Sequence, residues 1–273
     1  MSSRSKRRAA PQNLLIRTIS TAVMAPVILL LAWEGGWWFA LLLAIIGLYG
    51  LYEWNRMSGV VGRRLMIIYM ITLSGAVYLL MTQSGLTGLA VIAGGAILAG
   101  TVAMRSGLAV WPMAGLLYLG AGVLSLIWIR EAHGPLVTFW VLFLVWASDI
   151  AAYITGSLVG GPKLAPRLSP GKTWSGFLGG GVGAALVSGF FGHVAGLGAP
   201  FQLALAGLVL AGWSQLGDIV ESTIKRRFNV KDSGRLIPGH GGVLDRIDSL
   251  LFTVPVVALA LYLTDILGFA LYG

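Results

Sequence analysis

The sequence contains no cysteine and little charge, and each shortage excludes a class of protein. Without cysteine, the 273-residue chain can form neither disulfides nor thiolate metal sites. Charged residues make up 11% of the chain, whereas an ordinary soluble domain has about 25%. Hydrophobic residues reach 57%, and the mean hydropathy is +0.84. A soluble core could not bury so much apolar surface, so the composition predicts a polytopic membrane protein.

Long apolar runs predict an all-α fold of nine transmembrane helices. A helix needs about 20 mostly apolar residues to cross a bilayer. The runs that meet this criterion are 16–33, 36–54, 65–83, 86–104, 108–129, 135–159, 174–197, 200–222 and 250–272. The first run follows a basic segment, as in a signal peptide, but its length and the lack of a cleavage site before a soluble domain predict a retained helix.

The basic residues predict the orientation. With the N-terminus in the cytoplasm, 18 of the 19 lysines and arginines fall on the cytoplasmic side, and only Arg130 falls outside. The distribution of the basic residues, rather than the net charge of +9, therefore indicates orientation in the cell (inner) membrane, and we expect no nucleic-acid partner. We expect an N-terminal transmembrane unit over residues 1–130. A catalytic unit should cover 131–273, with cytoplasmic loops at 160–173 and 223–249.

Polar residues gather near the end of the run 200–222. Asp218, Glu221, Ser222 and Lys225 have the spacing i, i+3, i+4 and i+7, which places them on one face of a helix. An acid inside a membrane helix is expensive and normally lines a polar cavity. An i, i+4 ion pair between Glu221 and Lys225 without a catalytic role is an equally good explanation of Glu221.

The segment 239–249, GHGGVLDRIDS, combines flexible turns with charge. Asp245 and Asp248 share a helix face, and their hard oxygen ligands suit Mg²⁺. Arg246 can bind a phosphate with two hydrogen bonds. As an alternative to a metal site, an acid in the first turn of a helix can stabilise the helix dipole. This alternative would account for one aspartate, but it accounts less well for both. His240 could be a ligand, a base or a turn residue, and we favour contact with the substrate.

A third polar group lies around the loop 160–173. Asp149 is in the preceding apolar run, and the loop carries Lys172 and Thr173. The GKT triplet resembles a P-loop, but Pro166 stands where that motif requires glycine, and we expect no strand before it. Basic and hydroxyl side chains suit anionic oxygens. Elsewhere, Glu53 fits interfacial anchoring together with the tryptophans.

These groups converge on the predicted cytoplasmic face. Carboxylates, cations and a flexible loop are the parts of metal-assisted phosphoryl or nucleotidyl transfer. Their position at the edge of the bilayer favours one lipid substrate and one soluble substrate.

The segment 222–249 resembles the signature of the phosphatidate cytidylyltransferases, or CDP-diacylglycerol synthases. The positions that match are Ser222, Lys225, Arg226, Lys231, Asp232, Gly234, His240, Gly241, Gly242, Asp245, Arg246 and Asp248. The resemblance extends upstream through 146–156 and 164–176. It departs at Gly171 and Ser175, where the family favours a basic residue and a glutamate, so we leave both out of the site.

The resemblance implies transfer of a cytidylyl group from CTP to phosphatidate, with pyrophosphate leaving, and it suggests a homodimer. It implies that Asp218, Asp245 and Asp248 hold Mg²⁺, with a second cation if the two-metal pattern applies. Lys225, Arg226 and Arg246 would neutralise phosphate charge. Substrate contacts fall on Asp149, Lys172, Thr173, Ser222, Lys231, Asp232 and His240. A CTP-dependent lipid kinase and an ion-coupled transporter are the alternatives.

Overall fold

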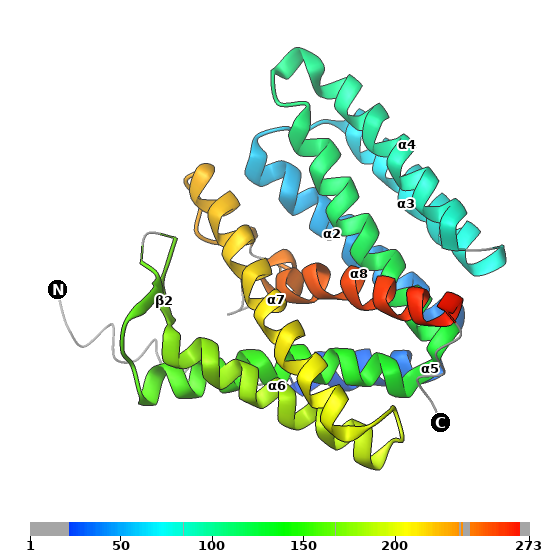
Figure 1. The fold of residues 1–273 in the computed structure, drawn as a ribbon. Helices are drawn as coiled ribbons and strands as arrows, with labels where there is room; N and C mark the ends of the chain where they lie inside the picture. The colour runs from blue at the N-terminus through cyan, green and yellow to red at the C-terminus, as the bar shows by residue number, and fades with distance from the viewer. Residues whose placement is uncertain (1–21, 84, 167, 235, 237–240, 268–273) are drawn as a thin grey trace.

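The computed structural model describes residues 22–83, 85–166, 168–234, 236 and 241–267, and these form a bundle of long helices (Figure 1). A helical segment over Ala22–Glu34 comes first. The long helices are α2 (Gly36–Ser58), α3 (Arg63–Thr82), α4 (Gly85–Ala103), α5 (Val110–Leu158), α6 (Trp174–Val194), α7 (Pro200–Arg227) and α8 (Leu244–Leu267). A short 3₁₀ turn, η1 (Met104–Ser106), follows α4.

The described residues confirm an all-α protein with several membrane-spanning helices. Within the described part of the chain, seven helices are long and apolar enough to cross a bilayer. The helix α5 covers two of the predicted runs, 108–129 and 135–159. The chain bends at Gly134, which is the one residue within α5 that has non-helical backbone angles. Gly134 has φ 78° and ψ −176°, and Pro135 follows it. Proline cannot donate the next hydrogen bond and disfavours α geometry at the residue before it, so the two halves of α5 run in different directions (Figure 1).

Two helix boundaries near the predicted site differ from the expected ones. The helix α7 continues to Arg227, so Lys225 and Arg226 lie on its last turns rather than in a loop. The helix α8 begins at Leu244, so Asp245 and Asp248 lie in its first turns. Both helices therefore carry charged residues beyond their apolar runs, where the hydropathy pattern no longer marks a helix.

The expected loop 160–173 contains a small β-hairpin, which the prediction missed. Strand β1 (Lys163–Ala165) pairs antiparallel with β2 (Ser169–Thr173), and Lys163 lies opposite Thr173. The GKT triplet is thus the end of a strand, although Pro166 still excludes a P-loop. The hairpin was difficult to predict because its strands are short and the segment is rich in proline and glycine, which are uncommon in strands. A short two-stranded hairpin depends mainly on the hydrogen bonds between its strands.

The helix α5 is the centre of the bundle and packs against all six other long helices. Small residues allow the closest approaches, as expected in membranes. A Cβ added at Gly183 of α6 would lie 2.5 Å from Ala151 Cβ and 3.0 Å from the carbonyl oxygen of Ala147, both on α5. The hairpin follows the second half of α5, whereas the end of α7 and the start of α8 lie against its first half, where Phe228 packs on Trp111 and the Tyr118 hydroxyl donates to the Asp248 backbone oxygen.

Candidate active site

A polar cluster forms where β2, α7 and α8 approach one another. The helix α7 presents Asp218, Glu221, Ser222 and Lys225 on one face, as their spacing predicts. Acids on α8 and a lysine on β2 meet this face. The cluster therefore unites three segments that are distant in sequence, and its members are Lys172, Asp218, Glu221, Lys225, Asp245 and Asp248.

Asp218 is paired with the hairpin. Lys172 Nζ lies 2.6 Å from Asp218 Oδ2 and also donates to the backbone oxygen of Gln215 at 3.3 Å. The hydroxyl of Ser222 donates to Asp218 Oδ1 at 3.4 Å. Both side chains of the ion pair are half-buried. Lys172 thus ties β2 to α7 and leaves the Asp218 carboxylate partly open to a ligand.

Lys225 bridges two carboxylates on different helices. Its Nζ lies 2.9 Å from Glu221 Oε2 and 2.8 Å from Asp245 Oδ1. The side chain of Lys225 is 12% exposed, and that of Glu221 is 1% exposed. The i, i+4 pair that we weighed as a structural explanation of Glu221 is therefore present. Because the same ammonium group also binds Asp245, the pair belongs to the polar cluster rather than to an isolated helix end.

Asp245 organises the segment that precedes α8. Its Oδ2 accepts hydrogen bonds from the amides of Ser233 and Gly242, each at 2.9 Å. The Ser233 amide also lies 3.2 Å from Oδ1. A carboxylate that accepts backbone amides at a helix start acts as a cap, so the capping explanation holds for Asp245. Binding to Lys225 adds an electrostatic role to this structural one.

Asp248 lies one turn further into α8 and is buried. Its Oδ1 accepts a hydrogen bond from the Ser249 amide at 2.7 Å, and its backbone oxygen accepts one from the hydroxyl of Tyr118 at 2.9 Å. The carboxylates of Asp248 and Glu221 face each other within hydrogen-bonding range. Two carboxylates so close need a shared proton or a cation between them.

Asp149, on α5, lies on the edge of the cluster. It is near enough to interact electrostatically with Asp218, Asp248, Lys172 and Arg246. Its side chain is exposed at the protein surface. The structure therefore brings Asp149 to the same place as the other predicted acids, although no direct hydrogen bond joins it to them among the described residues.

Other predicted site residues occupy different positions. Thr173 is buried and caps α6, since its hydroxyl accepts a hydrogen bond from the Gly176 amide at 3.1 Å. Arg226 is exposed and donates to the backbone oxygen of Val230 at 3.3 Å. Arg246 is also exposed. His240 lies outside the described residues. Substrate contacts by these four residues stay predictions.

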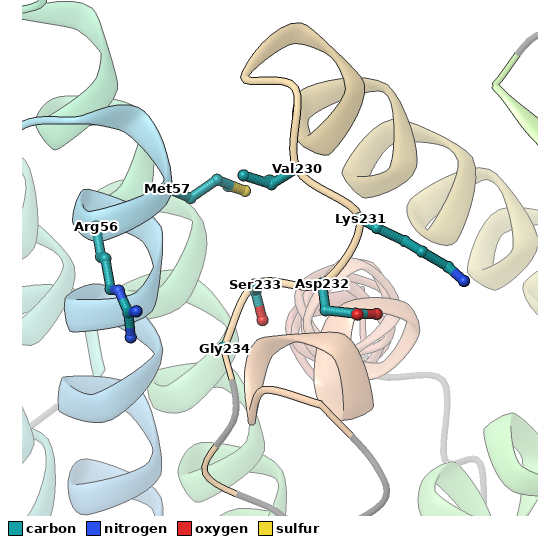
Figure 2. Close-up of a pocket in the computed structure, with 7 residues that line it drawn as sticks. All are labelled: Arg56, Met57, Val230, Lys231, Asp232, Ser233 and Gly234. Atoms are coloured by element: carbon teal, nitrogen blue, oxygen red, sulfur yellow. The ribbon is translucent and has the colours of Figure 1, made fainter. Parts of the chain in front are cut away.

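Lys231 and Asp232 line a cavity beside the cluster. The cavity has a volume of about 450 Å³ and lies between the end of α2 and the segment after α7 (Figure 2). Its lining residues are Arg56, Met57, Val230, Lys231, Asp232, Ser233 and Gly234. Figure 2 shows the side chains of Lys231 and Asp232 pointing away from α2, on the side opposite to Arg56. Both are exposed and available to a soluble ligand.

The interpretation of Glu53 as an interfacial anchor was wrong. Glu53 is only 1% exposed, and its Oε2 accepts hydrogen bonds from the Leu244 amide at 2.9 Å and the Ser233 hydroxyl at 3.2 Å. An interfacial anchor would face the lipid headgroups. The only sequence signal was the position of an acid within an apolar run. From this signal we predicted site residues at Asp149 and Asp218, but not at Glu53.

The donor set of the cluster fits a hard divalent cation. No group of three metal-ligating side chains in coordination range occurs among the described residues. However, Asp248 interacts with Glu221 and, electrostatically, with Asp218, and the buried Glu221 Oε1 has no hydrogen-bond donor among the described residues. Carboxylate oxygens are the ligands that Mg²⁺ prefers. The oxygens of Asp245, in contrast, are already engaged by Lys225, Ser233 and Gly242.

Comparison with known proteins identifies the family of this chain. Residues 15–264 match the cytidylyltransferase family. The chain belongs to that family. A phosphatidate cytidylyltransferase of Brucella suis biovar 1 (strain 1330) is 42% identical over 248 residues, which cover 88% of this chain and 90% of the relative.

A second relative supports the same assignment over nearly its whole length. A phosphatidate cytidylyltransferase of Staphylococcus epidermidis (strain ATCC 35984 / DSM 28319 / BCRC 17069 / CCUG 31568 / BM 3577 / RP62A) is 34% identical over 263 residues, covering 91% of this chain and 99% of the relative. Membership of the cytidylyltransferase family thus extends beyond the signature at 222–249. The apolar N-terminal helices, which the signature leaves out, are part of the match.

Proposed function

We propose that this member of the cytidylyltransferase family transfers a cytidylyl group from CTP to phosphatidate, giving CDP-diacylglycerol for phospholipid synthesis. The observation that carries the proposal is the polar cluster at the meeting of β2, α7 and α8, in a chain whose relatives are phosphatidate cytidylyltransferases. Its place among apolar helices suits a lipid substrate, and the adjoining cavity suits a soluble one.

The reaction exchanges one phosphoanhydride bond for another. A phosphate oxygen of phosphatidate attacks the α-phosphorus of CTP, and the bond from that phosphorus to the β-phosphate oxygen breaks. Pyrophosphate carries away the electron pair of the broken bond. Because charge builds on the phosphate oxygens during the transfer, fixed cations close to them lower the barrier.

Different residues in and around the cluster would neutralise phosphate charge and contact the substrates. Lys172 and Lys225 are held in place by carboxylates, so they can offer positive charge without losing conformational freedom on binding. Arg226 and Arg246 are exposed beside them and would contact the nucleotide or lipid phosphates. Lys231 and Asp232, which are exposed beside the cavity, would contact CTP, with Asp149, Ser222, Thr173 and His240 as further substrate contacts.

Asp218 and Asp248 would hold Mg²⁺, with Asp245 joining them if Lys225 releases it. When bound, the ion would act as a Lewis acid on phosphate oxygens. A second cation would have Glu221 and Asp149 as further carboxylate neighbours. The ion pairs of Lys172 and Lys225 keep these acids oriented in the ion-free protein.

The location and assembly of the protein form part of the proposal. We place the cluster on the cytoplasmic side of the cell (inner) membrane, where CTP is available, with nine spans and a cytoplasmic N-terminus. The distribution of lysine and arginine supports this orientation. We retain the catalytic unit 131–273 and a homodimer as predictions.

Product analysis tests the proposed function. The purified protein is incubated in mixed micelles with Mg²⁺, phosphatidate and CTP labelled at the α-phosphorus. We expect label in CDP-diacylglycerol and release of pyrophosphate. In a parallel reaction with CTP labelled at the γ-phosphorus, transfer of label to the lipid with CDP as product would instead identify a CTP-dependent lipid kinase. Absence of both products from the folded protein would reject nucleotidyl transfer.

A further inference from the structure

We propose that Glu53 is a positioning residue, which acts through Ser233 and Leu244 to hold the segment 230–234 and the start of α8 in the geometry that Asp245 requires. This inference rests on the proposed function, since it concerns the same site. Glu53 belongs to α2, which lies outside the signature at 222–249. No sequence pattern relates Glu53 to the charged residues of that signature. The structure nevertheless places the Glu53 carboxylate in contact with Ser233 and Leu244, both within the signature.

The contacts of Glu53 define a latch, by which we mean its bonds to Ser233 and Leu244. Glu53 Oε2 accepts from the Ser233 hydroxyl and from the Leu244 amide, at 3.2 and 2.9 Å. One oxygen thus joins Ser233, in the connection that follows α7, to Leu244, the first residue of α8. A buried carboxylate is costly unless hydrogen bonds satisfy it. Oε1 of Glu53 has no hydrogen-bond partner among the described residues, so the carboxylate depends on the bonds to Oε2, and this latch favours a single arrangement of Ser233 and Leu244.

The latch is connected directly to Asp245. The Ser233 amide donates to the Asp245 carboxylate, while the Ser233 hydroxyl donates to Glu53. Leu244, whose amide donates to Glu53, is the residue before Asp245. Glu53 and Asp245 therefore hold the same segment from two sides. Loss of the Glu53 contacts would move Ser233, and with it the donor that orients Asp245 beside Lys225.

Two glycines show how closely the segment fits around Glu53. A Cβ at Gly234 would lie 1.9 Å from Glu53 Oε1, and a Cβ at Gly242 would lie 2.6 Å from Glu53 Oε2 and 2.2 Å from Ser233 Oγ. Neither position can carry a larger residue without displacing the carboxylate. The glycines of the signature are therefore explained here by a side chain of α2.

The key variants are Glu53→Leu and Glu53→Gln. Leucine removes the acceptor, whereas glutamine can keep one oxygen at the Oε2 position and accept both hydrogen bonds. Because a misplacement near 1 Å can reduce turnover by about 100-fold, we expect Glu53→Leu to lower kcat at least about 10-fold, with KM for CTP and phosphatidate within about 3-fold. Glu53→Gln should restore kcat to within about 3-fold of the unmodified protein.

A second measurement reports on the segment itself. Hydrogen–deuterium exchange of peptides covering 230–250 should be faster in Glu53→Leu and unchanged in Glu53→Gln, because the Leu244 amide loses its acceptor only in the former. Ser233→Ala removes one of the latch bonds and should accelerate the same exchange. The double variant Glu53→Leu/Ser233→Ala should have the kcat of Glu53→Leu alone, because both changes remove the same bond.

Tyr69→Phe is the matched control. Tyr69 is fully buried and hydrogen-bonded to Asn55 of α2 and to the Pro112 carbonyl oxygen, and none of its hydrogen bonds involves the described residues of the segment 230–234. We expect its kcat and exchange to match those of the unmodified protein. Equal losses in Tyr69→Phe and Glu53→Leu would show a general packing effect and overturn the inference.

Other results would also overturn it. They are an unchanged kcat in Glu53→Leu, or a loss in Glu53→Gln equal to that in Glu53→Leu. If Glu53→Leu does not fold, Ser233→Ala decides, and unchanged exchange over 230–250 in that variant rejects the latch. An inactive unmodified protein would reject the proposed function, while the exchange measurement would still test the latch.

Discussion

Lys225 shows how one side chain can serve both stability and chemistry. Its ammonium group lies between Glu221 on its own helix and Asp245 on α8, and it is largely buried. A buried charge is tolerated because it is paired, and removal of one partner leaves the others uncompensated. At the residue scale, the polar cluster is therefore a set of mutually dependent ionic groups rather than a list of independent ligands.

We expect Lys225→Met to destabilise the protein more than Lys172→Met. Breaking a buried pair costs about 3–5 kcal/mol, whereas an exposed pair contributes about 0–1 kcal/mol. Lys172 is more exposed than Lys225, and its partner Asp218 is half-buried. Thermal unfolding in detergent should show the larger decrease for Lys225→Met. Equal decreases would contradict the assignment of Lys225 as the buried centre of the cluster.

We expect Asp245→Asn to lose turnover while it stays folded. Asparagine keeps one oxygen that can accept the Ser233 or Gly242 amide, but it removes the charge that faces Lys225. Loss of one electrostatic contact at an active site typically reduces kcat by about 100- to 1000-fold. Radiolabelled CDP-diacylglycerol formation measures the effect, and size-exclusion chromatography checks the fold. An active Asp245→Asn protein would remove Asp245 from the chemistry.

At the scale of the elements, close helix contacts set the site. The helix α6 lies against α5 and α7. Glycine and alanine line these contacts because the lipid provides no hydrophobic force between helices, and dispersion and packing take its place. Two glycines of α7 differ sharply in their surroundings. A Cβ at Gly207 would lie 2.3 Å from Ser188 Oγ, whereas one at Gly212 would meet only Phe177 Cζ at 3.8 Å.

Gly207→Ala should therefore destabilise the protein, and Gly212→Ala is its control. Overpacking at a tight contact costs about 1–3 kcal/mol, while alanine in an open helical position gains about 0.5–1 kcal/mol over glycine. We expect a lower thermal midpoint for Gly207→Ala and an unchanged or higher one for Gly212→Ala. Similar midpoints in both variants would show that α6 and α7 are less tightly packed than the structure indicates.

The hairpin and the latch show what local sequence patterns could not reveal. Strand β2 is short and rich in turn-forming residues, so its pairing with β1 depends on contacts across the loop. Glu53 resembled any acid near the end of a membrane helix, and its partners are about 180 and 191 positions away. By contrast, the spacing of Asp218 and Lys225 predicted their shared helix face correctly, because helical geometry is local.

At the scale of the whole molecule, we expect the ends of α6 to lie on opposite sides of the membrane. Its 21 residues are enough to cross the apolar core, since a helix rises about 1.5 Å per residue. The hairpin lies at one end of α6, and the turn to α7 lies at the other (Figure 1). Lys172 joins the hairpin to the polar cluster. The proposed topology therefore assigns Gly171 and Ala199 to opposite compartments.

Single-cysteine labelling tests this topology without interference, because the chain has no native cysteine. Gly171 has no neighbour within 4 Å of an added Cβ, and Ala199 is exposed. We expect a membrane-impermeant maleimide to label Ala199→Cys in intact cells and Gly171→Cys only in inverted vesicles. The reverse pattern would place the polar cluster outside the cytoplasm.

The sequence by itself determined the class of this protein, its long helices and its family. Those features depend on composition, on the local period of the helix and on a contiguous signature, all of which can be read along the chain. Tertiary structure alone decided that Lys225 would join Glu221 to Asp245, that Lys172 would meet Asp218, and that Glu53 would hold the start of α8. These pairs form because helix packing brings distant residues together, and a hydropathy pattern contains no record of which helices become neighbours.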